Sequence, residues 1–271
     1  MRIPFIKMHG LGNDFVVLDA RADALPEMTR AKAKALADRN TGIGCDQLIL
    51  LQPATDGSLA DFRMRIFNHD GGEVEACGNA SRAVALLHGT SARVETASGT
   101  ISLTPSEGGA SVDMGAPRFD WDAIPLDQPL DTMHMPVGWE ALEAPDAVNV
   151  GNPHVVFFVD DEHTVELDRL GPLIEHDPLF PDRVNVNVAS VSSGAISLRV
   201  WERGAGLTRA CGTGACATAV AAIRRKLVTS PVAVHLPGGT LTIDWHPGGT
   251  ITMSGPAQES FRGSFEWDDF G

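Results

Sequence analysis

The tripeptide Ala76-Cys77-Gly78 returns as Ala210-Cys211-Gly212, almost half the length of this 271-residue chain further on. Each copy opens a run of small residues with helical spacing, so both cysteines are expected at the start of a helix. The unpaired N–H groups and the positive dipole end of a helix start favour a thiolate and can hold a carboxylate beside it. A single free cysteine is more often a small buried apolar residue, but the repeated context predicts acid/base chemistry by two sulfur atoms.

The elements around the two cysteines recur in the same order. A strand pattern over 62–67 and a glycine turn precede Cys77, and a strand pattern over 196–202 and a glycine turn precede Cys211. A helix pattern and three strand candidates separated by glycine turns follow each cysteine. This order indicates an internal duplication. We therefore predict an α/β fold of the α+β type, with two pseudo-symmetric domains, each a mostly antiparallel sheet or barrel wrapped around a central helix.

Further strands and a helix are predicted in the first half. Apolar runs around Phe5, over 15–18 and over 48–51 are typical of strands. Thr29 can cap a helix that runs to about Asn40. These elements lie ahead of the repeated strand, turn and cysteine, and we assign them to the first domain.

The domain boundary is expected in the proline-rich stretch 116–136, whose composition is typical of a linker. We expect an N-terminal domain over 1–117 and a C-terminal domain over 118–263, each with one cysteine of the pair. Residues from about 264 are expected to return to the first domain. A pseudo-twofold axis would bring both helix starts to one interdomain cleft, where ligand sites often form.

The composition excludes several classes of partner. The formal charge of −14 would repel nucleic acid and anionic lipid, and no apolar run approaches the ~18 residues of a membrane span. We therefore expect no nucleic-acid and no membrane partner. Four cysteines without a CxxC motif, and no apolar leader at the N-terminus, favour the reducing cytoplasm.

The sequence also offers little for a cofactor. The chain has four lysines, three of them in charge-rich helical patterns, which leaves few candidates for the Schiff base of pyridoxal phosphate. Nine histidines without an HxxxH spacing or a close Cys/His cluster make a zinc site unexpected. We predict no metal and no organic cofactor.

Two opposed thiols suit the inversion of a stereocentre next to a carboxylate. This reaction requires a base that removes the α-proton from one face and an acid that returns a proton to the other. A thiolate and a thiol can fill these roles, because the pKa of cysteine lies near the working pH. Backbone N–H groups just after each cysteine could hold the carboxylate and stabilise the charge that develops on it. We expect these groups to come from Gly78, Asn79, Gly212 and Thr213.

Other interpretations of the cysteines remain open. A redox pair or thiol sensor formed by Cys77 with Cys211 belongs to a different functional class, and neither residue has the CxxC context of such sites. Cys216 is expected in the core, since it points about 140° away from Cys211 on the same helix. Cys45, beside a glycine turn, is expected to be structural, with a place in the cleft as the alternative.

Several longer motifs carry a specific resemblance. They are, in order, FIKMHGLGNDF at 5–15, GIGCDQ at 42–47, NHDGG at 68–72, CGN at 77–79 and ERGAGLTRACGTGAC at 202–216. With them, the chain resembles the diaminopimelate epimerase family along nearly its whole length. The resemblance implies a cofactor-independent epimerase with that family's fold. Such an enzyme interconverts LL- and meso-diaminopimelate in lysine and peptidoglycan precursor biosynthesis.

The resemblance also implies roles for individual residues. Cys77 and Cys211 would be the two catalytic acid/base thiols. His154 and Glu202 would tune the pKa values of these thiols. The substrate would be bound by Asn13, Gln47, Asn68, Gly78, Asn79, Asn152, Asn185, Glu202, Arg203, Gly212 and Thr213. The family further implies a small-molecule substrate as the partner, and a homodimer.

Residue chemistry supports the distal end of this implied site. The far end of diaminopimelate carries a second ammonium and carboxylate, which suit the guanidinium of Arg203 and neutral amides such as Asn68 and Asn185. A related amino-acid racemase of the proline or hydroxyproline type would share the two thiols and need no such clamp. That racemase is the alternative within the same chemistry.

Overall fold

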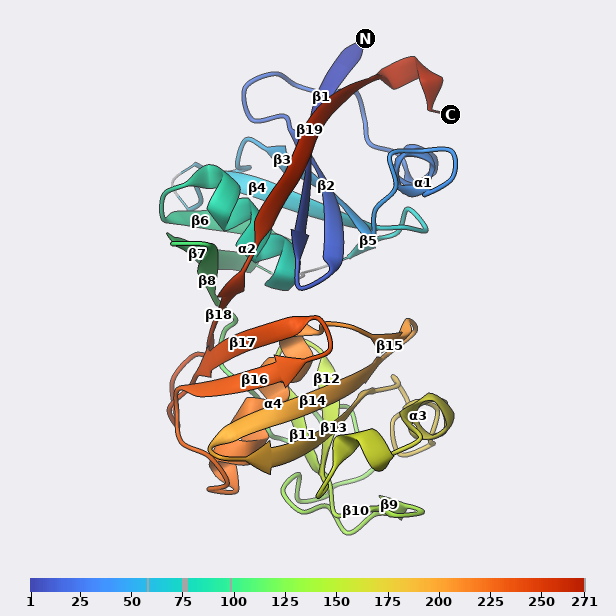
Figure 1. Cartoon of the computed structure of the whole chain (residues 1–271), viewed down its shortest axis with the longest axis vertical. Helices are drawn as coiled ribbons and strands as arrows, with labels where there is room; N and C mark the ends of the chain where they lie inside the picture. The colour runs from blue at the N-terminus through green and yellow to red at the C-terminus, as the bar shows by residue number, and fades with distance from the viewer. Residues whose placement is uncertain (58, 75–77, 98, 271) are drawn as a thin grey trace. The chain divides into compact units, whose positions relative to one another are not determined.

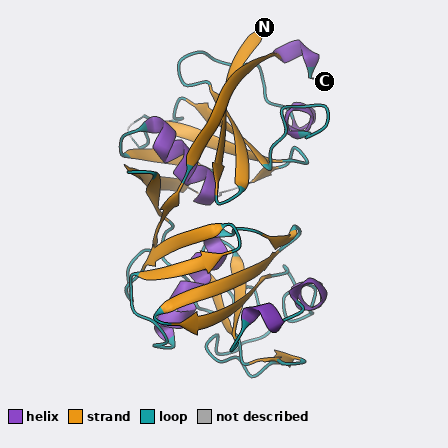
Figure 2. Cartoon of the chain, in the orientation of Figure 1, coloured by secondary structure: helices purple, strands orange, loops and turns teal. Residues whose placement is uncertain are grey.

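The computed structural model describes residues 1–57, 59–74, 78–97 and 99–270. The chain divides into two compact units, Met1–Asp113 with Ser254–Gly271 and Met114–Met253 (Figure 1). Both units combine strands with helices (Figure 2), which confirms the predicted α/β class. Of the two repeated cysteines, Cys211 lies in the second unit and Cys77 lies outside the described residues.

The first unit is built on a mostly antiparallel sheet. Its strands are β1 (Arg2–Gly10), β2 (Asn13–Asp19), β3 (Gln47–Gln52), β4 (Phe62–Asn68), β5 (Glu73–Val74), β6 (Ala92–Thr96), β7 (Gly99–Ser106), β8 (Gly109–Asp113) and β19 (Gln258–Glu266). Two pairs are parallel, β2 with β3 and β4 with β6. A parallel pair needs a crossover connection, and the helices α1 (Arg30–Ala37) and α2 (Gly78–His88) lie in these two crossovers.

The second unit repeats this topology. Its strands are β9 (Gly138–Trp139), β10 (Leu142–Glu143), β11 (Asp146–Asn149), β12 (Pro153–Phe158), β13 (Asn185–Ser192), β14 (Ala195–Glu202), β15 (Gly206–Thr208), β16 (Val232–Leu236) and β17 (Gly239–Asp244), and β18 (Thr252–Pro256) leads back to the first unit. The parallel pairs are β12 with β13, connected through α3 (Leu167–Glu175), and β14 with β16, connected through α4 (Gly212–Arg224). The duplication predicted from the sequence is therefore present in the topology.

α4 is the central helix of its unit. It contacts β11, β12, β13, β14, β16 and β17, and most of its residues are buried. A helix that is apolar on every side belongs inside a core, and Cys216 lies there as predicted. α2 contacts β1, β7, β8 and β19 in the same manner. Thr29 caps α1 as predicted, since its hydroxyl accepts a hydrogen bond from the N–H of Lys32 at 3.2 Å, although α1 already ends at Ala37.

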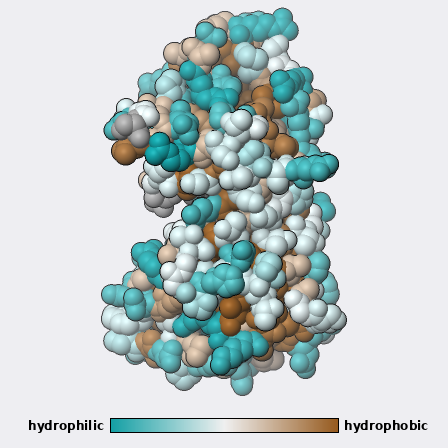
Figure 3. Space-filling model, turned by 90° about the vertical axis from the view of Figure 1, so that its left-hand side faces the viewer, coloured by the Kyte–Doolittle hydropathy of each residue, from teal (hydrophilic) through white to brown (hydrophobic). Residues whose placement is uncertain are grey.

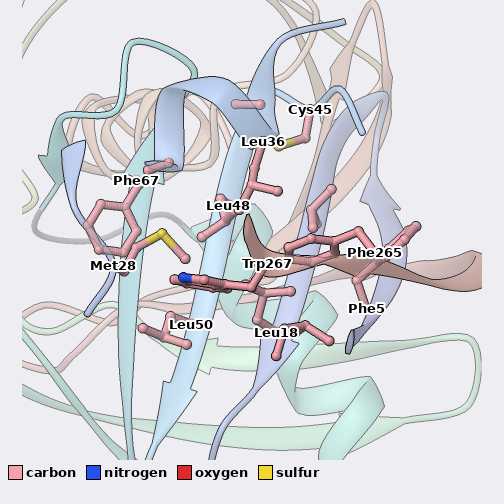
Figure 4. Close-up of a cluster of buried hydrophobic side chains, with 14 of the residues drawn as sticks. Phe5, Leu18, Met28, Leu36, Cys45, Leu48, Leu50, Phe67, Phe265 and Trp267 are labelled. Carbon is pink, nitrogen blue, oxygen red and sulfur yellow. The ribbon is translucent and has the colours of Figure 1, made fainter. Parts of the chain in front are cut away.

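The core of the first unit joins strands, α1 and the C-terminal segment (Figure 4). Its labelled members are Phe5, Leu18, Met28, Leu36, Cys45, Leu48, Leu50, Phe67, Phe265 and Trp267. Cys45 is buried in this cluster, and burial raises the pKa of its thiol to about 12. Cys45 therefore packs as a small apolar residue, in line with its structural interpretation.

Residues 116–136 do not form the predicted linker. Ile124, Leu126 and Met135 are buried in the core of the second unit. Prolines interrupt regular secondary structure in this stretch, but they do not prevent the apolar side chains between them from packing. The composition alone was therefore misleading.

The boundary near the C-terminus also differs from the expected return at about 264. The chain rejoins the first unit at Ser254, because β19 pairs with β1 from Gln258 to Glu266. At the other boundary the second unit begins at Met114, close to the expected start at 118.

The face shown in Figure 3 is mainly hydrophilic (teal), with small hydrophobic patches (brown) between polar residues. Within the described ranges, no helix combines the length and the apolar character that crossing a bilayer requires.

Candidate active site

The predicted site residues form two groups, one in each unit. The first unit contains Asn13, Gln47, Asn68, Gly78 and Asn79. The second unit contains Asn152, His154, Asn185, Glu202, Arg203, Cys211, Gly212 and Thr213. Each group gathers strand ends and the first turn of a buried helix, α2 or α4. Cys77 directly precedes α2 in the sequence and is outside the described residues.

Cys211 is buried and caps the N-terminus of α4. Its Sγ accepts a hydrogen bond from the N–H of Gly214 at 3.3 Å and lies 3.5 Å from the hydroxyl of Thr213. The backbone of Cys211 is extended, with φ −122° and ψ 109°, so the helix begins directly after it. The sulfur therefore faces the helix N-terminus, as the sequence predicts.

Burial and Glu202 decide the protonation of Cys211. Burial raises the pKa of Cys211 well above its ordinary value, and the negative charge of Glu202 raises it further. The hydrogen bonds with Thr213 and Gly214 lower this pKa, but by less than burial and Glu202 raise it. Desolvation is the largest of these effects on the pKa of Cys211, so it opposes the bias toward a thiolate that a helix start provides and favours the protonated thiol.

Glu202 ends β14 and accepts two hydrogen bonds, one from the hydroxyl of Thr208 at 2.5 Å and one from the thiol of Cys211. Burial raises the pKa of Glu202, and these two hydrogen bonds lower it. The proton of the Cys211 thiol thus points toward the carboxyl group of Glu202. A pair of this kind can release a proton from sulfur to a reacting carbon.

His154 lies fully buried on β12. Its Nε2 is 2.9 Å from Oδ1 of Asn152, and its Nδ1 is 3.1 Å from Nδ2 of Asn187. Burial lowers the pKa of His154 to about 3, so the ring is neutral at physiological pH. The ring is connected to Cys211 through Asn152, whose Nδ2 donates to the hydroxyl of Thr213 at 3.3 Å.

Arg203 is exposed at the start of the turn after β14. Its N–H donates to Oδ1 of Asn185 at 3.0 Å, and its Nη1 donates to the carbonyl of Asp182 at 2.9 Å. Asn185 is buried and donates to the carbonyl of Pro153 at 2.8 Å. Asn185 therefore holds the turn that carries Arg203. Since a guanidinium has five N–H donors, Arg203 keeps donors for an anion.

The first unit gathers amide side chains at its strand ends. Nδ2 of Asn79 donates to Oδ1 of Asn13 at 3.3 Å, and Asn13 donates to Asp46 at 3.0 Å. Nε2 of Gln47 donates to Oδ1 of Asn68 at 3.0 Å. In the described part of the chain, Oε1 of Gln47 is buried and has no hydrogen-bond partner. A buried acceptor of this kind suits a donor group of a ligand.

The duplication relates the two groups residue by residue. Phe15 pairs with Gln47 across the parallel strands β2 and β3, and His154 pairs with Asn185 across β12 and β13. Extended along the strands, this correspondence equates Asn13 with Asn152, Gln47 with Asn185 and Asn68 with Glu202. The binding candidates of each unit therefore lie at the same edge of its own sheet.

Two buried polar residues beside these candidates were missed by the sequence reasoning. Nη2 of Arg82 donates to Oδ1 of Asn79 at 2.6 Å, and Asn187 contacts His154. The available signals were spacings: Arg82 follows Asn79 at i+3 on a helix, and Asn187 follows Asn185 at i+2 on a strand.

No group of three or more His, Cys, Asp or Glu side chains that could hold a metal ion occurs among the residues described. The absence of any cofactor remains a prediction from the sequence.

A family model described as Diaminopimelate epimerase matches residues 5–119 and 146–259. The chain belongs to the diaminopimelate epimerase family. Proteins named diaminopimelate epimerase from Erythrobacter litoralis and Sphingopyxis alaskensis are 68% and 64% identical to it, over 100% and 98% of both chains. The protein of that name from Zymomonas mobilis is 54% identical over 100% of both chains. The resemblance seen in the sequence is confirmed, and with it the enzyme class, an epimerase.

Solved structures of low sequence identity share the fold of this diaminopimelate epimerase family member. A phenazine biosynthesis protein of the PhzF family from Bacillus anthracis matches with a TM-score of 0.69 and 15% identity, over 98% of this chain and 99% of its own. A hydroxyproline epimerase from Agrobacterium vitis matches with a TM-score of 0.66 and 16% identity, over 97% and 92%. At these identities the likeness concerns the fold alone, and it confirms the predicted fold class.

Proposed function

We propose that the protein converts LL-diaminopimelate to meso-diaminopimelate and back, by proton transfer at one α-carbon without a cofactor. One thiolate takes the α-proton from one face, and the opposite thiol gives its proton to the other face. The thiols are Cys77 and Cys211, and the reverse reaction exchanges their roles. The observation that carries the proposal is the position of Cys211, which is buried at the start of α4 beside the carboxyl group of Glu202, in a member of this family.

Cys211 is suited to the acid role of this cycle. The proton that burial and Glu202 keep on its sulfur is the proton that the α-carbon needs. After the transfer, the new thiolate is met by the N–H of Gly214 and the hydroxyl of Thr213, which both stabilise negative charge on sulfur. We assign pKa-tuning roles to Glu202, which touches the thiol, and to His154.

The α-carbanion is the high-energy species of this reaction, and helix N-termini are suited to stabilising it. The first N–H groups of a helix have no acceptor within the helix, so they can bind the carboxylate that shares the negative charge. Each such donor lowers the barrier by about 3 kcal/mol. We assign this role to Gly78, Asn79, Gly212 and Thr213.

The remaining candidates bind the distal amino-acid group. The guanidinium of Arg203 can pair with the distal carboxylate. The open acceptor Oε1 of Gln47 suits an ammonium. The other residues that we assign to substrate binding are Asn13, Asn68, Asn152, Asn185 and Glu202.

The domain roles, the oligomeric state, the compartment and the pathway of the enzyme are part of the same proposal. Each unit is a domain that carries one thiol of the pair, and the protein acts as a homodimer in the cytoplasm. Its reaction serves the synthesis of lysine and of peptidoglycan precursors. The family resemblance supports the dimer and the pathway, and four cysteines without a CxxC motif support the compartment.

Isotope exchange tests the chemistry. LL-diaminopimelate is incubated with the protein and a reductant in deuterated water, and α-deuteration is followed by NMR. We expect exchange with the native protein and its loss in Cys77→Ala and in Cys211→Ala. A native protein that leaves the α-proton in place overturns the proposal, and so does unchanged exchange in both variants.

Arg203→Met tests the substrate against the racemase alternative. The change removes a charge-assisted interaction worth about 1.5–3 kcal/mol, so kcat/KM for diaminopimelate should fall about tenfold to hundredfold. Alkylation of Cys211 should keep its rate. Equal turnover of proline and diaminopimelate would favour the racemase, whereas a thiol sensor would give no α-exchange with either.

A further inference from the structure

Asn187 is fully buried on β13 and contacts His154 on the neighbouring strand β12. Its amide nitrogen lies 3.1 Å from Nδ1 of His154 and 2.9 Å from the carbonyl oxygen of Val155. Its amide oxygen is buried and has no hydrogen-bond partner within the described ranges. Asn187 belongs neither to the predicted thiol chemistry nor to the predicted substrate-binding set.

The backbone fixes which way this amide points. The carbonyl of Val155 can only accept a hydrogen bond, so the nitrogen of Asn187 must face it. The same nitrogen lies 3.1 Å from Nδ1 of His154 and 3.4 Å from the carbonyl oxygen of Asn185, and the shorter distance assigns its second hydrogen to Nδ1. Since the ring is neutral and Nδ1 accepts, the ring hydrogen sits on Nε2.

This tautomer sets the direction of every hydrogen bond that follows. Nε2 of His154 donates to Oδ1 of Asn152 at 2.9 Å, and Nδ2 of Asn152 donates to the hydroxyl of Thr213 at 3.3 Å. The hydroxyl then has its own hydrogen for Sγ of Cys211, 3.5 Å away. We call this series, from Asn187 to Cys211, the relay. All of its bonds are donated toward the sulfur, and the last one stabilises a thiolate.

The first unit offers a comparison from the same chain. The duplication equates His154 with Phe15 and Asn187 with Ile49, and both residues of the first unit are buried. The first unit therefore has neither the ring nitrogen, because Phe15 stands in place of His154, nor the amide, because Ile49 stands in place of Asn187. A buried oxygen without a partner is unfavourable for folding, so an apolar residue would suit position 187 better if packing alone mattered.

We propose that Asn187 is a positioning residue, which selects the Nε2–H tautomer of His154 and so makes the relay end as a donor to Cys211. The proposal rests on the proposed function only in taking Cys211 as a reacting thiol. Gly214 belongs to the same arrangement, because a Cβ at this position would lie 2.7 Å from Oδ1 of Asn187.

Asn187→Asp should reverse the relay. An aspartate only accepts, and a protonated aspartic acid has a single hydrogen, which the carbonyl of Val155 takes. In both states the oxygen that faces His154 accepts, so it attracts a hydrogen to Nδ1. A neutral ring then accepts at Nε2, and the amide of Asn152 turns to donate to it. Oδ1 of Asn152 now faces Thr213 and accepts the hydrogen of its hydroxyl. The hydroxyl then no longer donates to Sγ of Cys211.

The tautomer can be measured directly. The protein is labelled with ¹⁵N-histidine, and the ring nitrogens of His154 are observed by NMR at pH 8, with His154→Gln for assignment. We expect Nε2–H in the native protein and in the matched control Ile49→Leu, and a hydrogen on Nδ1 in Asn187→Asp. A native protein with its hydrogen on Nδ1, or an Asn187→Asp protein with the native tautomer, overturns the proposal.

Thiol reactivity gives a second readout that needs no substrate. Asn187→Leu removes the amide without adding charge. Alkylation of Cys211 by iodoacetamide, followed by mass spectrometry of its peptide, should then have its midpoint at higher pH. kcat/KM should fall about tenfold, the effect of one hydrogen bond to a charged group. An unchanged alkylation profile in a folded Asn187→Leu protein overturns the proposal. A native protein that does not epimerise diaminopimelate leaves both readouts intact and counts against the proposed function alone.

Discussion

Thr213→Val removes one hydroxyl from the first turn of α4 and keeps the shape of the side chain. This hydroxyl accepts a hydrogen bond from Asn152 at 3.3 Å and lies 3.5 Å from Sγ of Cys211. Toward a thiol it is an ordinary neutral partner, but toward a thiolate it is a charge-assisted donor. The substitution should therefore weaken the thiolate stage of the reaction more than it weakens the fold.

The size of the effect follows from these contacts. A hydrogen bond to a charged group contributes about 1.5–3 kcal/mol. A loss of about 2 kcal/mol corresponds to a kcat/KM roughly thirtyfold below that of the native enzyme. Thr213 is half-buried, so water can satisfy the amide of Asn152 that the substitution leaves. We therefore expect the free energy of unfolding to change by less than about 1 kcal/mol.

The assay is α-deuteration of LL-diaminopimelate in deuterated water, with thermal unfolding as the test of folding. Thr213→Ser is the matched control, because it keeps the hydroxyl and loses the methyl group. Its kcat/KM should stay close to that of the native enzyme. An equal loss in Thr213→Val and Thr213→Ser, or no loss in either, would refute the reasoning.

Three further predictions concern protonation and packing. Glu202→Gln removes the charge that helps to raise the pKa of Cys211, so alkylation of Cys211 at a fixed pH should become faster and epimerisation slower. Slower alkylation would contradict the assigned cause. The folded-state pKa of His154 is lowered to about 3, so between about pH 6.5 and 3 the ring is protonated in the unfolded chain and neutral in the folded chain. The free energy of unfolding should fall as the pH drops from about 6.5 toward 3, by up to about 1.4 kcal/mol per pH unit for this group. His154→Gln should remove this part of the slope in urea titrations, and an unchanged slope would exclude the assignment. Cys45→Ser buries a hydroxyl in an apolar cluster and should destabilise the protein by about 1–3 kcal/mol; a native denaturation midpoint in this variant would be inconsistent with that cluster.

Local signals in the sequence were sufficient for the duplication and for the start of α4. Glycine turns and apolar alternation mark strand ends within a few residues, so the order strand, turn, cysteine and helix could be predicted. The burial of Ile124 and Leu126 could not, because it depends on contacts with residues such as Phe157 that lie elsewhere in the sequence. The prolines near them report only that the backbone is irregular.

The sequence names candidate residues for the site, but it does not give their protonation states. Motifs pointed to Cys211, Glu202 and His154, whereas the protonated thiol follows from desolvation, which only the folded chain produces. Asn185 and Asn187 alternate with valines, a pattern typical of a strand with one buried and one solvent-exposed face. The first half of β13 is buried on both faces, so these amides face protein groups.

The return of β19 to β1 fixes the order in which the two units can be completed during synthesis. The second unit is one uninterrupted stretch, Met114–Met253, while the core of the first unit also needs Phe265 and Trp267. The N-terminal part of a chain leaves the ribosome first. All residues of the second unit have therefore been synthesised before β19, the last strand of the first unit. A chain cut short before β19 would leave an apolar core open to water, and cellular proteases would remove it as an unfinished product.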